Sequence, residues 1–473
     1  NCLGAVHVPI HGTLSPRQAA DQLVHSESKF AIIENEALNK SVAAFQNEFP
    51  GDLKIASYEQ LADKSCPVMA DMLVKGDAAN GRQLAETTAA EIDHDAVTTI
   101  LYTSGTTGEP KGIMLSQRNL VSNAVSIVES FTDQPLEVRL NFLPLSHIFG
   151  RMCDLYTWLV RGSELALTQS RDTIIDDCKR FRPTMINGVP FFFERVRQKL
   201  EEKGKADQPG ILQELLGGRV LGCFSGGGAL HDDTYKYYIS QDVPLMQGYG
   251  LTESSPVISF SNLETHGVGQ AGQPLIGVEV KIAEDDEILT RGPHVMLGYW
   301  KDSEGTKQVI RDGWLHTGDL GTLDEQGRVQ ITGRKKEMIV TATGKNVFPS
   351  HVEALLCRDP LILQAVVFGD KKNCLSALIV PDPDVLKAEI KKRRLWVFSK
   401  RHAVRHKKIV QLYRERIDEQ LKDLAHHEQV PLFKVLHYGF TIESGYMTAK
   451  LSLRRNKIEE DFVKEIDAMY TRS

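Results

Sequence analysis

The sequence predicts an α/β protein with a large N-terminal domain of parallel α/β layers and a β-rich subdomain, followed by a small α+β C-terminal domain. Strand-like and helix-like segments alternate from about residue 163, and short strand-like runs replace them from about residue 267. A basic junction at residues 333–336 then precedes a new series of elements. A chain of 473 residues is long enough to bury the core of one large domain and of a smaller one.

The alternating segment predicts the central sheet. Its strand-like runs are rich in apolar residues, and runs of helical length separate them. The expected strands and helices, in alternation and starting with a strand, are 163–168, 173–181, 184–190, 191–200, 219–225, 232–240 and 243–250. Strands that alternate with helices predict a parallel sheet that is covered on both faces.

The later part of the chain predicts the β-rich subdomain and the domain boundary. Short strand-like runs, separated by Gly, Asp and Pro residues, occupy 278–283, 287–292 and 327–332. After the basic junction we expect a strand at residues 337–343, a glycine loop, and a helix that begins at Pro349. We therefore place the N-terminal domain at residues 1–333 and the C-terminal domain at residues 334–473.

Charge, hydropathy and cysteine content limit the classes of protein that fit. The net charge of −6 argues against nucleic acid as the main partner, and no apolar run approaches the roughly 18 residues that cross a membrane. The seven scattered cysteines include no CxxC pair, so we expect no disulfide framework, no zinc site and a cytoplasmic location. Residues 3–16 already resemble the inside of a domain, so we expect that upstream residues are missing.

The segment YTSGTTGEPKG gives the strongest functional signal. Strand-like residues 97–103 lead into a loop of glycine and hydroxyl residues that carries Lys111. Glycines allow backbone N–H groups to converge on a polyphosphate, hydroxyls add donors, and the lysine adds a positive charge. A Walker A loop is excluded, because Pro110 stands where that motif needs glycine. Residues 112–115 are strand-like and a helix begins near Ser116, so we expect a hairpin over the phosphates.

Two further glycine motifs follow predicted strands. Gly226, Gly227 and Gly228 lie at the carboxyl edge of the inferred sheet, where open α/β sheets bind ligands. They would let a flat base lie against the backbone, or they form a tight turn between strand and helix. In GYGLTE, Glu253 stands where a GxGxxG motif has its third glycine. A carboxylate beside a triphosphate needs a cation between them, and Mg²⁺ with oxygen ligands fits this role.

The loop YTSGTTGEPKG resembles the signature of the adenylate-forming superfamily, which includes acyl-CoA synthetases, luciferases and the adenylation domains of peptide synthetases. Other segments agree in order and spacing: LPLSHIFGR, SGGGAL, GYGLTES, GWLHTGDLG, GRKKEMIVTATGKNVFPSHVE and a C-terminal lysine. The resemblance implies an acyl-CoA synthetase/luciferase-like fold with a mobile C-terminal domain. It also implies that a carboxylate and ATP give acyl-AMP and pyrophosphate, and that a thioester then forms, with Mg²⁺ and coenzyme A required.

The resemblance assigns the ATP contacts residue by residue. It places Tyr249 at the adenine face, Thr252 at the α-phosphate, and Glu253 with Thr103 at the metal. Asp319 would accept hydrogen bonds from the ribose hydroxyls, aided by Arg334, although an Asp between glycines is otherwise usually a turn residue. The residues expected to bind the nucleotide are Thr103, Ser104, Gly105, Thr106, Thr107, Gly108, Lys111, Gly226, Gly227, Gly228, Tyr249, Gly250, Thr252, Asp319 and Arg334.

Thr252, His147 and Lys450 are the expected catalytic residues. The resemblance places His147 against the acyl substrate, whereas a histidine on an apolar stretch is otherwise more often a core residue. The family has an essential lysine shortly before an arginine pair, and its charge stabilises the charge that develops during attack on the α-phosphate. Lys450 stands farther than usual from the pair that begins at Arg454, and aligning on that pair puts Ser452 near the expected position. We assign the role to Lys450.

Three features of the predicted C-terminal domain complete the assignment. By resemblance Lys336 occupies the hinge, and Gly344 lines the pantetheine tunnel of coenzyme A after the domain rotates. The segment 387–417 is dense in Lys and Arg. It is either a solvated helical face or a seat for a polyanion, such as the coenzyme A phosphates or an anionic membrane surface.

The substrate is inferred from LPLSHIFGR and NGVPFFFERVRQKL, which together resemble the long-chain fatty acyl-CoA synthetase branch. Residues 191–193 either line an acyl channel or pack in the core. The expected partners are a fatty acid, ATP and coenzyme A. The alternatives are an acyl-acyl carrier protein synthetase or acyl-AMP ligase, and a catalytically defective relative that binds acyl groups or nucleotides. A peripheral membrane contact and a homodimer stay open.

Overall fold

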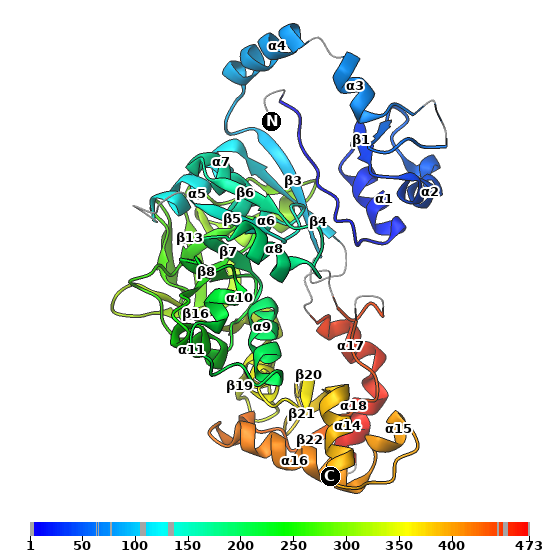
Figure 1. Cartoon of the computed structure of the whole chain (residues 1–473), viewed down its shortest axis with the longest axis vertical. Helices are drawn as coiled ribbons and strands as arrows, with labels where there is room; N and C mark the ends of the chain where they lie inside the picture. The colour runs from blue at the N-terminus through cyan, green and yellow to red at the C-terminus, as the bar shows by residue number, and fades with distance from the viewer. Residues whose placement is uncertain are drawn as a thin grey trace. The chain divides into compact units, whose positions relative to one another are not determined.

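The computed structural model describes residues 4–62, 64, 66–75, 78–104, 110–130, 137–441, 444–447 and 453–471 (Figure 1). The chain divides into two compact units, called unit 1 and unit 2 below. Unit 1 contains Asn1–Thr317 and Thr322–Ile331, and unit 2 contains Gly318–Gly321 and Thr332–Ser473.

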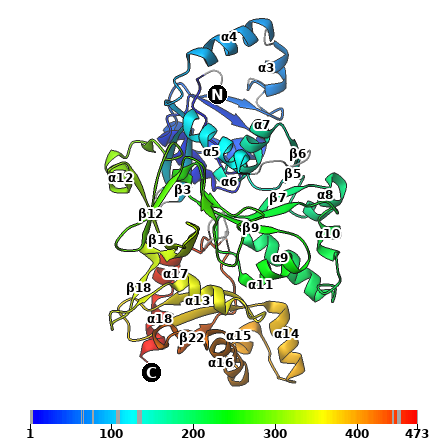
Figure 2. The same cartoon turned by 90° about the vertical axis from the view of Figure 1, so that its left-hand side faces the viewer.

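Unit 1 contains a seven-stranded sheet in the order β11-β10-β9-β8-β7-β5-β6. Figure 2 labels β9, β7, β5 and β6 of this sheet. Its strands are β5 (Val138–Asn141), β6 (Glu164–Leu167), β7 (Met185–Gly188), β8 (Gly222–Ser225), β9 (Leu245–Gly250), β10 (Val257–Phe260) and β11 (Gln273–Pro274). Strands β5 to β9 pair in parallel, and β10 and β11 add an antiparallel edge. The parallel sheet that the alternating pattern predicts is therefore confirmed.

Four helices accompany the parallel strands: α8 (Ile174–Phe181), α9 (Pro190–Glu202), α10 (Ile211–Leu215) and α11 (Asp232–Ser240). One core cluster joins Ile186 and Leu245 of the sheet to Phe193 of α9 and Tyr238 of α11, all fully buried. A strand that is buried on both faces carries apolar residues on both, so its sequence does not alternate between apolar and polar residues. Such strands need helices packed against them.

The predicted phosphate hairpin belongs to a separate three-stranded sheet, β14-β4-β3. Its strands are β3 (Val97–Ser104), β4 (Pro110–Ser116) and β14 (Gly298–Tyr299). Helix α5 (Gln117–Glu129) begins where expected, because the Ser116 side chain accepts a hydrogen bond from the backbone of Asn119 at 3.1 Å and caps the helix. The short helices that follow β5 are α6 (Ile148–Gly150), the π-helix η2 (Arg151–Tyr156) and α7 (Thr157–Arg161).

The β-rich segment forms a third sheet in the order β12-β13-β16-β15, and β17 pairs with β16. The strands are β12 (Glu279–Ile282), β13 (Glu287–Arg291), β15 (Ile310–Arg311), β16 (Trp314–Leu323) and β17 (Val329–Arg334). The 3-10 helix η3 (Thr252–Ser254) follows β9, and α12 (Ser303–Val309) follows β14. The strand-like runs predicted after residue 267 are therefore strands, and β16 is a further strand that the sequence pattern did not indicate.

The N-terminal part of unit 1 has a two-stranded parallel sheet of β1 and β2. Its elements are α1 (Pro16–His25), β1 (Phe30–Ile33), α2 (Glu36–Ala43), η1 (Gln46–Glu48), β2 (Lys54–Ser57), α3 (Met69–Lys75) and α4 (Ala78–Glu91). The end of α1 contacts the hairpin sheet, because the Trp300 indole donates to the His25 carbonyl at 3.0 Å and His25 Nδ1 lies 2.7 Å from the Tyr102 hydroxyl.

Unit 2 has a three-stranded sheet, β20-β21-β22, and a short hairpin of β18 and β19. Its elements are η4 (Lys335–Glu337), β18 (Ile339–Val340), β19 (Asn346–Val347), α13 (Pro349–Leu356), β20 (Ile362–Phe368), β21 (Ser376–Pro381), α14 (Pro383–Lys392), α15 (Lys400–Ala403), α16 (Lys407–Leu421), η5 (His426–Glu428), β22 (Leu432–Val435), α17 (Arg455–Asp461) and α18 (Val463–Tyr470). The strand expected at 337–343 is limited to β18, whereas the helix expected at Pro349 is present.

Alternation along β20 and β21 divides the core of unit 2 into two clusters. Val367 and Ile379 belong to the cluster that includes α13 and α16 residues, whereas Val366 and Leu378 belong to the cluster that includes α17 and α18 residues. Helices therefore pack on both faces of this sheet. Among the residues described, no helix is long and apolar enough to span a bilayer.

Candidate active site

The predicted phosphate loop is a hairpin, as the sequence indicated. Strands β3 and β4 are antiparallel, and Thr103 pairs with Lys111 while Ser104 pairs with Pro110. Buried Leu101 and Ile113 hold the two strands in the core of unit 1. The remaining loop residues, Gly105, Thr106, Thr107 and Gly108, lie outside the described residues, as does the side chain of Ser104.

Lys111 and Glu253 contact the same tyrosine, although they come from different elements. Tyr299 of β14 donates its hydroxyl to Glu253 Oε1 at 3.0 Å, and Lys111 Nζ lies 4.5 Å from the centre of the Tyr299 ring. Lys111 Nζ also forms an ion pair with Asp302 Oδ2 at 3.2 Å. The lysine of the hairpin and the expected metal-binding carboxylate are therefore joined through one aromatic side chain.

Tyr299 is a site residue that the sequence analysis missed. Its role depends on the pairing of β14 with β4, which opposes Tyr299 to Ile113, and no local motif marks that long-range contact. Burial raises the pKa of the Tyr299 hydroxyl, and the Glu253 carboxylate raises it further. The phenol therefore stays protonated and donates a hydrogen bond to Glu253.

The GYGLTE segment makes a sharp turn from β9 into η3. A Cβ on Gly250 would lie 1.7 Å from the backbone oxygen of Pro256, so only glycine fits there. Leu251 donates its N–H to that same oxygen at 3.0 Å, and Thr252 is buried. The turn thus places Thr252 and Glu253 directly after the carboxyl end of a central strand.

Tyr249, expected at the adenine face, lies within a core cluster of unit 1. It packs with Ile258, Ala271, Ile288 and Val329, and 7% of its surface is exposed. The assignment of this ring to adenine stays a prediction.

The three glycines of SGGGAL follow β8 at the same edge of the sheet. A Cβ on Gly226 would lie 3.0 Å from the Phe149 ring, and Gly227 has φ of +78°. A Cβ on Gly228 would be 3.6 Å from Pro190 at the start of α9. The close approach at Gly226 and the positive φ at Gly227 explain why small residues occur here, and both fit a turn as well as a base-binding surface.

His147 lies close to this edge through its neighbour Phe149. Its Nδ1 accepts a hydrogen bond from the Phe149 N–H at 3.2 Å and caps α6. The side chain is partly buried, and Phe149 in turn lies against Gly226. The expected role beside the acyl substrate stays a prediction. In the aromatic run that follows β7, Phe193 is buried in the core, Phe192 packs against it and Phe191 is 51% exposed, and the acyl channel stays a prediction.

Unit 2 contains both residues that the sequence analysis expects at the ribose, Asp319 and Arg334. Arg334 Nε lies 2.8 Å from Asp319 Oδ1, and 52% of the arginine side chain is exposed against 6% of the aspartate. Gly318, with φ of +71°, precedes the aspartate, and a Cβ on Gly333 would lie 2.4 Å from the Phe348 ring. The ion pair brings together two residues that stand 15 positions apart and that the sequence assigned to one function.

The other expected residues of unit 2 lie on turns. Lys336 is exposed on η4, and Gly344 has φ of +75° in the loop between β18 and β19, with nothing within 4 Å of its Cβ position. Thr341 closes that loop, because its hydroxyl contacts the backbone N–H and carbonyl of Lys345 at 3.1 Å.

Lys450 and Ser452 lie outside the described residues. The flanking residues Met447 and Leu453 form an antiparallel bridge. Arg455 donates to Glu353 Oε2 at 2.7 Å and to the Val367 carbonyl at 2.6 Å. The second arginine of the pair thus links α17 to α13 and β20, which is a structural role.

Comparisons with known proteins cover both parts of the chain. The family model described as AMP-binding enzyme matches residues 2–300, and the model described as AMP-binding enzyme C-terminal domain matches residues 336–473. The long-chain-fatty-acid–CoA ligase FadD15 of Mycobacterium bovis is 30% identical, over 99% of this chain and 84% of the relative. A chloroplastic long-chain-fatty-acid–acyl-carrier-protein ligase of Arabidopsis thaliana is 27% identical, over 99% of this chain and 76% of the relative.

Solved structures share the fold at lower identity. The adenylation domain of a carboxylate reductase from Mycobacterium chelonae has a TM-score of 0.77 and 23% identity, over 98% of this chain and 76% of that chain. The O-succinylbenzoate coenzyme A synthetase of Bacillus subtilis, in complex with ATP and a magnesium ion, has a TM-score of 0.70 and 24% identity, over 95% of this chain and 83% of that chain. The mixed α/β fold with a separate C-terminal domain is therefore the predicted one.

Proposed function

Because the chain belongs to the AMP-binding enzyme family, we propose that it activates a fatty acid with ATP, forms acyl-AMP and pyrophosphate, and transfers the acyl group to coenzyme A. The observation that carries the proposal is the Glu253–Tyr299–Lys111 arrangement beside the glycine-rich hairpin. It joins a carboxylate for a metal ion to a cation for phosphate, and a nucleoside triphosphate with its metal needs both.

The residues of unit 1 would bind the triphosphate and its metal. Lys111 and the hairpin donors would neutralise phosphate charge, and Thr252 would donate to the α-phosphate. Glu253 and Thr103 would hold Mg²⁺, whose preferred ligands are carboxylate, hydroxyl and phosphate oxygens. The described residues contain no cluster of three His, Cys, Asp or Glu side chains for a metal, so the phosphates and water would supply the other ligands. The metal would polarise the phosphate under attack.

The ribose and adenine contacts complete the proposed nucleotide site. Asp319 would accept hydrogen bonds from the two ribose hydroxyls, and its ion pair with Arg334 orients that buried carboxylate. The carboxyl-edge glycines Gly226 to Gly228 would border the base, and Gly250 permits the turn beside them. His147 would position the acyl carboxylate.

We base the proposed acyl chain length and thiol acceptor on the names of the relatives. We propose a long-chain fatty acid and coenzyme A, as in the printed name of FadD15. Acyl carrier protein is a second candidate acceptor, because one relative is named for it. A defective relative that binds without turnover is the remaining alternative.

A product screen separates these alternatives. The full chain is incubated with ATP, Mg²⁺ and saturated fatty acids of increasing length, with coenzyme A or with holo-acyl carrier protein, and thioester is measured by mass spectrometry. We expect acyl-CoA, with the highest kcat/KM for long chains. If thioester formed only on the carrier protein, the acceptor would be acyl carrier protein and not coenzyme A. Nucleotide binding without pyrophosphate release would identify a defective relative.

We further propose that residues 1–333 and 334–473 act as two domains, with Lys336 as the hinge between two half-reactions. Adenylation needs Lys450, and thioester formation needs the pantetheine path that Gly344 lines. Lys336→Pro should therefore still form acyl-AMP but transfer it slowly, because proline fixes φ near −65°. Gly344→Leu should likewise form acyl-AMP but transfer the acyl group slowly. Lys450→Ala should lose adenylation but still convert supplied acyl-AMP to thioester.

The controls are Lys336→Ala, which keeps backbone freedom, and Gly344→Asn, which tolerates a positive φ. Both should transfer the acyl group better than their matched variants. Equal loss of both half-reactions in all three test variants would contradict the hinge proposal and leave a single fixed site.

A further inference from the structure

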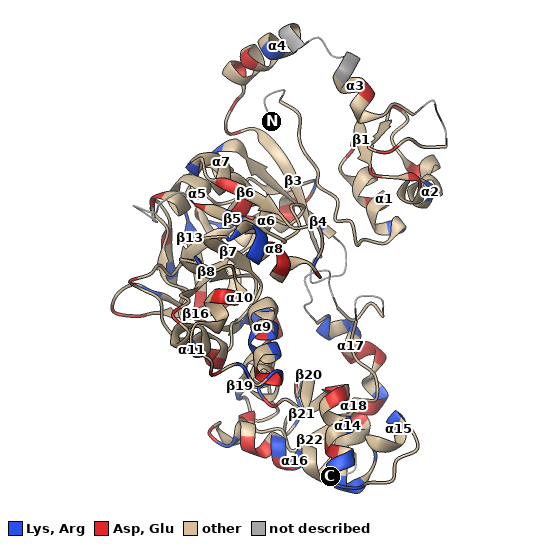
Figure 3. Cartoon of the chain, viewed as in Figure 1, with Lys and Arg blue, Asp and Glu red and all other residues tan. Residues whose placement is uncertain are grey.

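The basic segment of unit 2 lies on α14, α15, the start of α16 and the loops between them. No acidic residue occurs between Glu389 and Glu415. The Lys and Arg residues in this interval are Lys391, Lys392, Arg393, Arg394, Lys400, Arg401, Arg405, Lys407, Lys408 and Arg414. Figure 3 colours the basic residues of this region blue. The whole chain carries a net charge of −6, so this positive charge is a local concentration.

Most of these cations have no acidic partner among the residues that the structure describes. Arg393 and Lys392 pair with Glu389, and Arg414 pairs with Asp418. Within the described part of the chain, no ion pair involves the exposed basic side chains between α15 and the start of α16, which are Lys400, Arg401, Arg405, Lys407 and Lys408. A solvated salt-bridged helix face would alternate its charges, and this surface does not.

The loop between α14 and α15 presents two aromatic side chains to solvent. Trp396 is 82% exposed and Phe398 is 83% exposed, the two highest values among the large apolar side chains that the structure describes. Their neighbours Leu395 and Val397 are partly buried, and Leu395 packs against the core of unit 2. The loop is thus anchored by alternate residues and directs its largest apolar groups outward.

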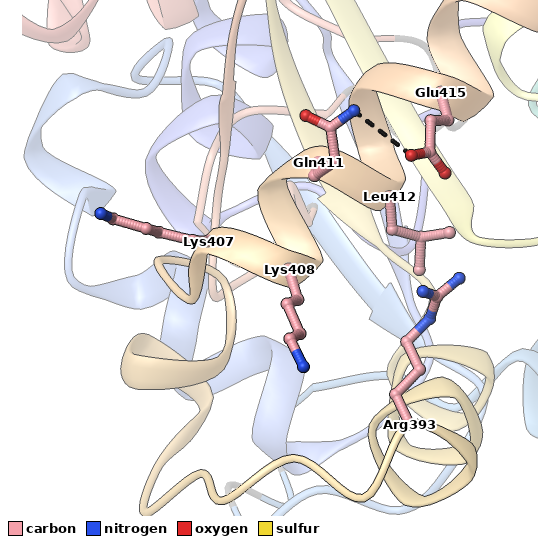
Figure 4. A pocket seen from close by; sticks show the side chains of 6 residues that line it. All are labelled: Arg393, Lys407, Lys408, Gln411, Leu412 and Glu415. Carbon is pink, nitrogen blue, oxygen red and sulfur yellow. Dashed lines mark hydrogen bonds between the residues drawn. The ribbon is translucent and has the colours of Figure 1, made fainter.

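A shallow hollow of about 350 Å³ lies beside this loop, lined by Arg393, Lys407, Lys408, Gln411, Leu412 and Glu415 (Figure 4). In Figure 4 the Arg393 side chain reaches toward Leu412 of α16. Glu415 accepts a hydrogen bond from Gln411 at 3.2 Å. Lys408 and Arg393 thus lie beside the hollow, whose lining also includes the Glu415 carboxylate, whereas the Lys407 side chain extends away from the other lining residues in Figure 4.

We propose that this aromatic loop and the adjoining basic residues form a docking surface for an anionic lipid bilayer. Trp and Phe side chains are stable at the boundary between headgroups and acyl chains, and Lys and Arg bind anionic headgroups. The exposed Trp396 and Phe398 favour a bilayer over single-stranded nucleic acid, because the two rings can enter hydrocarbon together and no basic residue stands between them to contact a nucleic-acid backbone.

Vesicle flotation tests the proposal with the full chain and without ATP, acid or thiol, so its outcome is independent of the proposed activity. Vesicles of phosphatidylcholine are compared with vesicles that also contain phosphatidylglycerol. We expect binding to the anionic vesicles alone, with a blue shift of tryptophan emission that is lost in Trp396→Phe. Raising the salt from ~0.1 M to ~1 M shortens the screening length from about 10 Å to about 3 Å and should weaken binding.

Two double variants separate the contributions. Trp396→Ser with Phe398→Ser, and Lys407→Glu with Lys408→Glu, should each weaken vesicle binding by about tenfold or more. The matched controls are Tyr58→Ser with Leu73→Ser, exposed apolar residues of unit 1, and Lys203→Glu with Lys205→Glu at the end of α9. Both controls should bind like the wild type.

Three outcomes would overturn the proposal. The first is a wild-type chain that does not bind anionic vesicles. The second is an aromatic variant that binds them as tightly as the wild type, which would show that the basic residues alone bind the vesicles. The third is tighter binding of a single-stranded oligonucleotide than of vesicles, which would assign the surface to nucleic acid.

Discussion

Glycines occur in the candidate site of both units, but the two units need them for different physical reasons. In unit 1, a Cβ on Gly250 would lie 1.7 Å from the Pro256 oxygen. In unit 2, nothing lies within 4 Å of the Cβ position of Gly344, and its φ of +75° alone favours glycine. The first glycine is needed for space inside a packed turn, and the second for a backbone angle in an open loop.

The charged residues of the two units also differ, in how far they are exposed to solvent. Glu253 and Lys111 are only partly exposed, and both contact Tyr299. Lys336 and Arg334 of unit 2 are exposed, although Arg334 also holds Asp319. We therefore expect that changes in unit 1 affect folding and nucleotide chemistry together, whereas changes in the turns of unit 2 affect one reaction step and leave the fold intact.

The comparison is tested most strongly by the two glycines themselves. Gly250→Ala should destabilise unit 1 by about 3 kcal/mol or more, because backbone must move to accept the methyl group. Gly344→Ala should cost only about 1–2 kcal/mol, the strain of a left-handed conformation. Urea unfolding followed by circular dichroism measures both. A larger loss for Gly344→Ala would reverse the comparison.

Glu253→Gln should keep the shape of the site and remove its charge. We expect acyl-AMP formation to fall by about 10² or more, since a metal ion supplies several kcal/mol of charge stabilisation. Pyrophosphate release is measured across a range of Mg²⁺ concentrations, with urea unfolding as the control for folding. A variant with wild-type rate and wild-type Mg²⁺ dependence would remove this carboxylate from the mechanism.

Acid should destabilise unit 1 through His294. Burial lowers the pKa of this side chain from 6.5 to about 4, so the unfolded chain binds the proton more readily. The stability that the neutral ring contributes is complete above pH 6.5 and is lost as the pH falls toward 4. Between pH 7 and pH 5 the loss should be about 2 kcal/mol.

His294→Gln removes this titration and keeps a polar partner for Thr290, whose hydroxyl lies 2.9 Å from His294 Nε2. The free energy of unfolding of the variant should therefore change less between pH 7 and pH 5 than that of the wild type. Asp154, whose pKa burial raises to about 6, titrates in both proteins and does not affect the difference. The same pH dependence in both would exclude His294 as the cause.

Tyr299→Phe gives the smallest expected effect and isolates one hydrogen bond. It removes the donor to Glu253 but keeps the ring beneath Lys111, so kcat/KM should fall by about tenfold, as for a hydrogen bond to a charged group. The kcat/KM of Tyr299→Leu should fall further, because this substitution also removes the ring beneath Lys111. If Tyr299→Phe had unchanged kcat/KM and unchanged Mg²⁺ dependence, the hydroxyl would have no positioning role.

Elements with local signals were predictable from the sequence. The alternating pattern predicts β6 to β9 with α8, α9 and α11, the position of Pro110 excludes a Walker A loop, and the strand-like residues 112–115 predict the hairpin. The candidate site residues that the sequence predicts lie within continuous motifs, as Lys111 and Glu253 do.

Features that depend on distant pairing were not predictable. Tyr299 reaches Glu253 only because β14 pairs with β4, and the residues 337–343 look strand-like although only β18 forms, because Gly344 turns the chain into β19. The contact between Arg455 and Glu353 likewise joins residues about a hundred positions apart. Such contacts depend on the tertiary structure, which local patterns do not encode.

Product stoichiometry tests the central claim most directly. The full chain is incubated with ATP, Mg²⁺, palmitate and coenzyme A, and AMP, ADP, pyrophosphate, phosphate and palmitoyl-CoA are quantified together. The account predicts one AMP and one pyrophosphate for each thioester formed, because activation passes through acyl-AMP. Thioester formation accompanied by ADP and phosphate, without AMP, would contradict it.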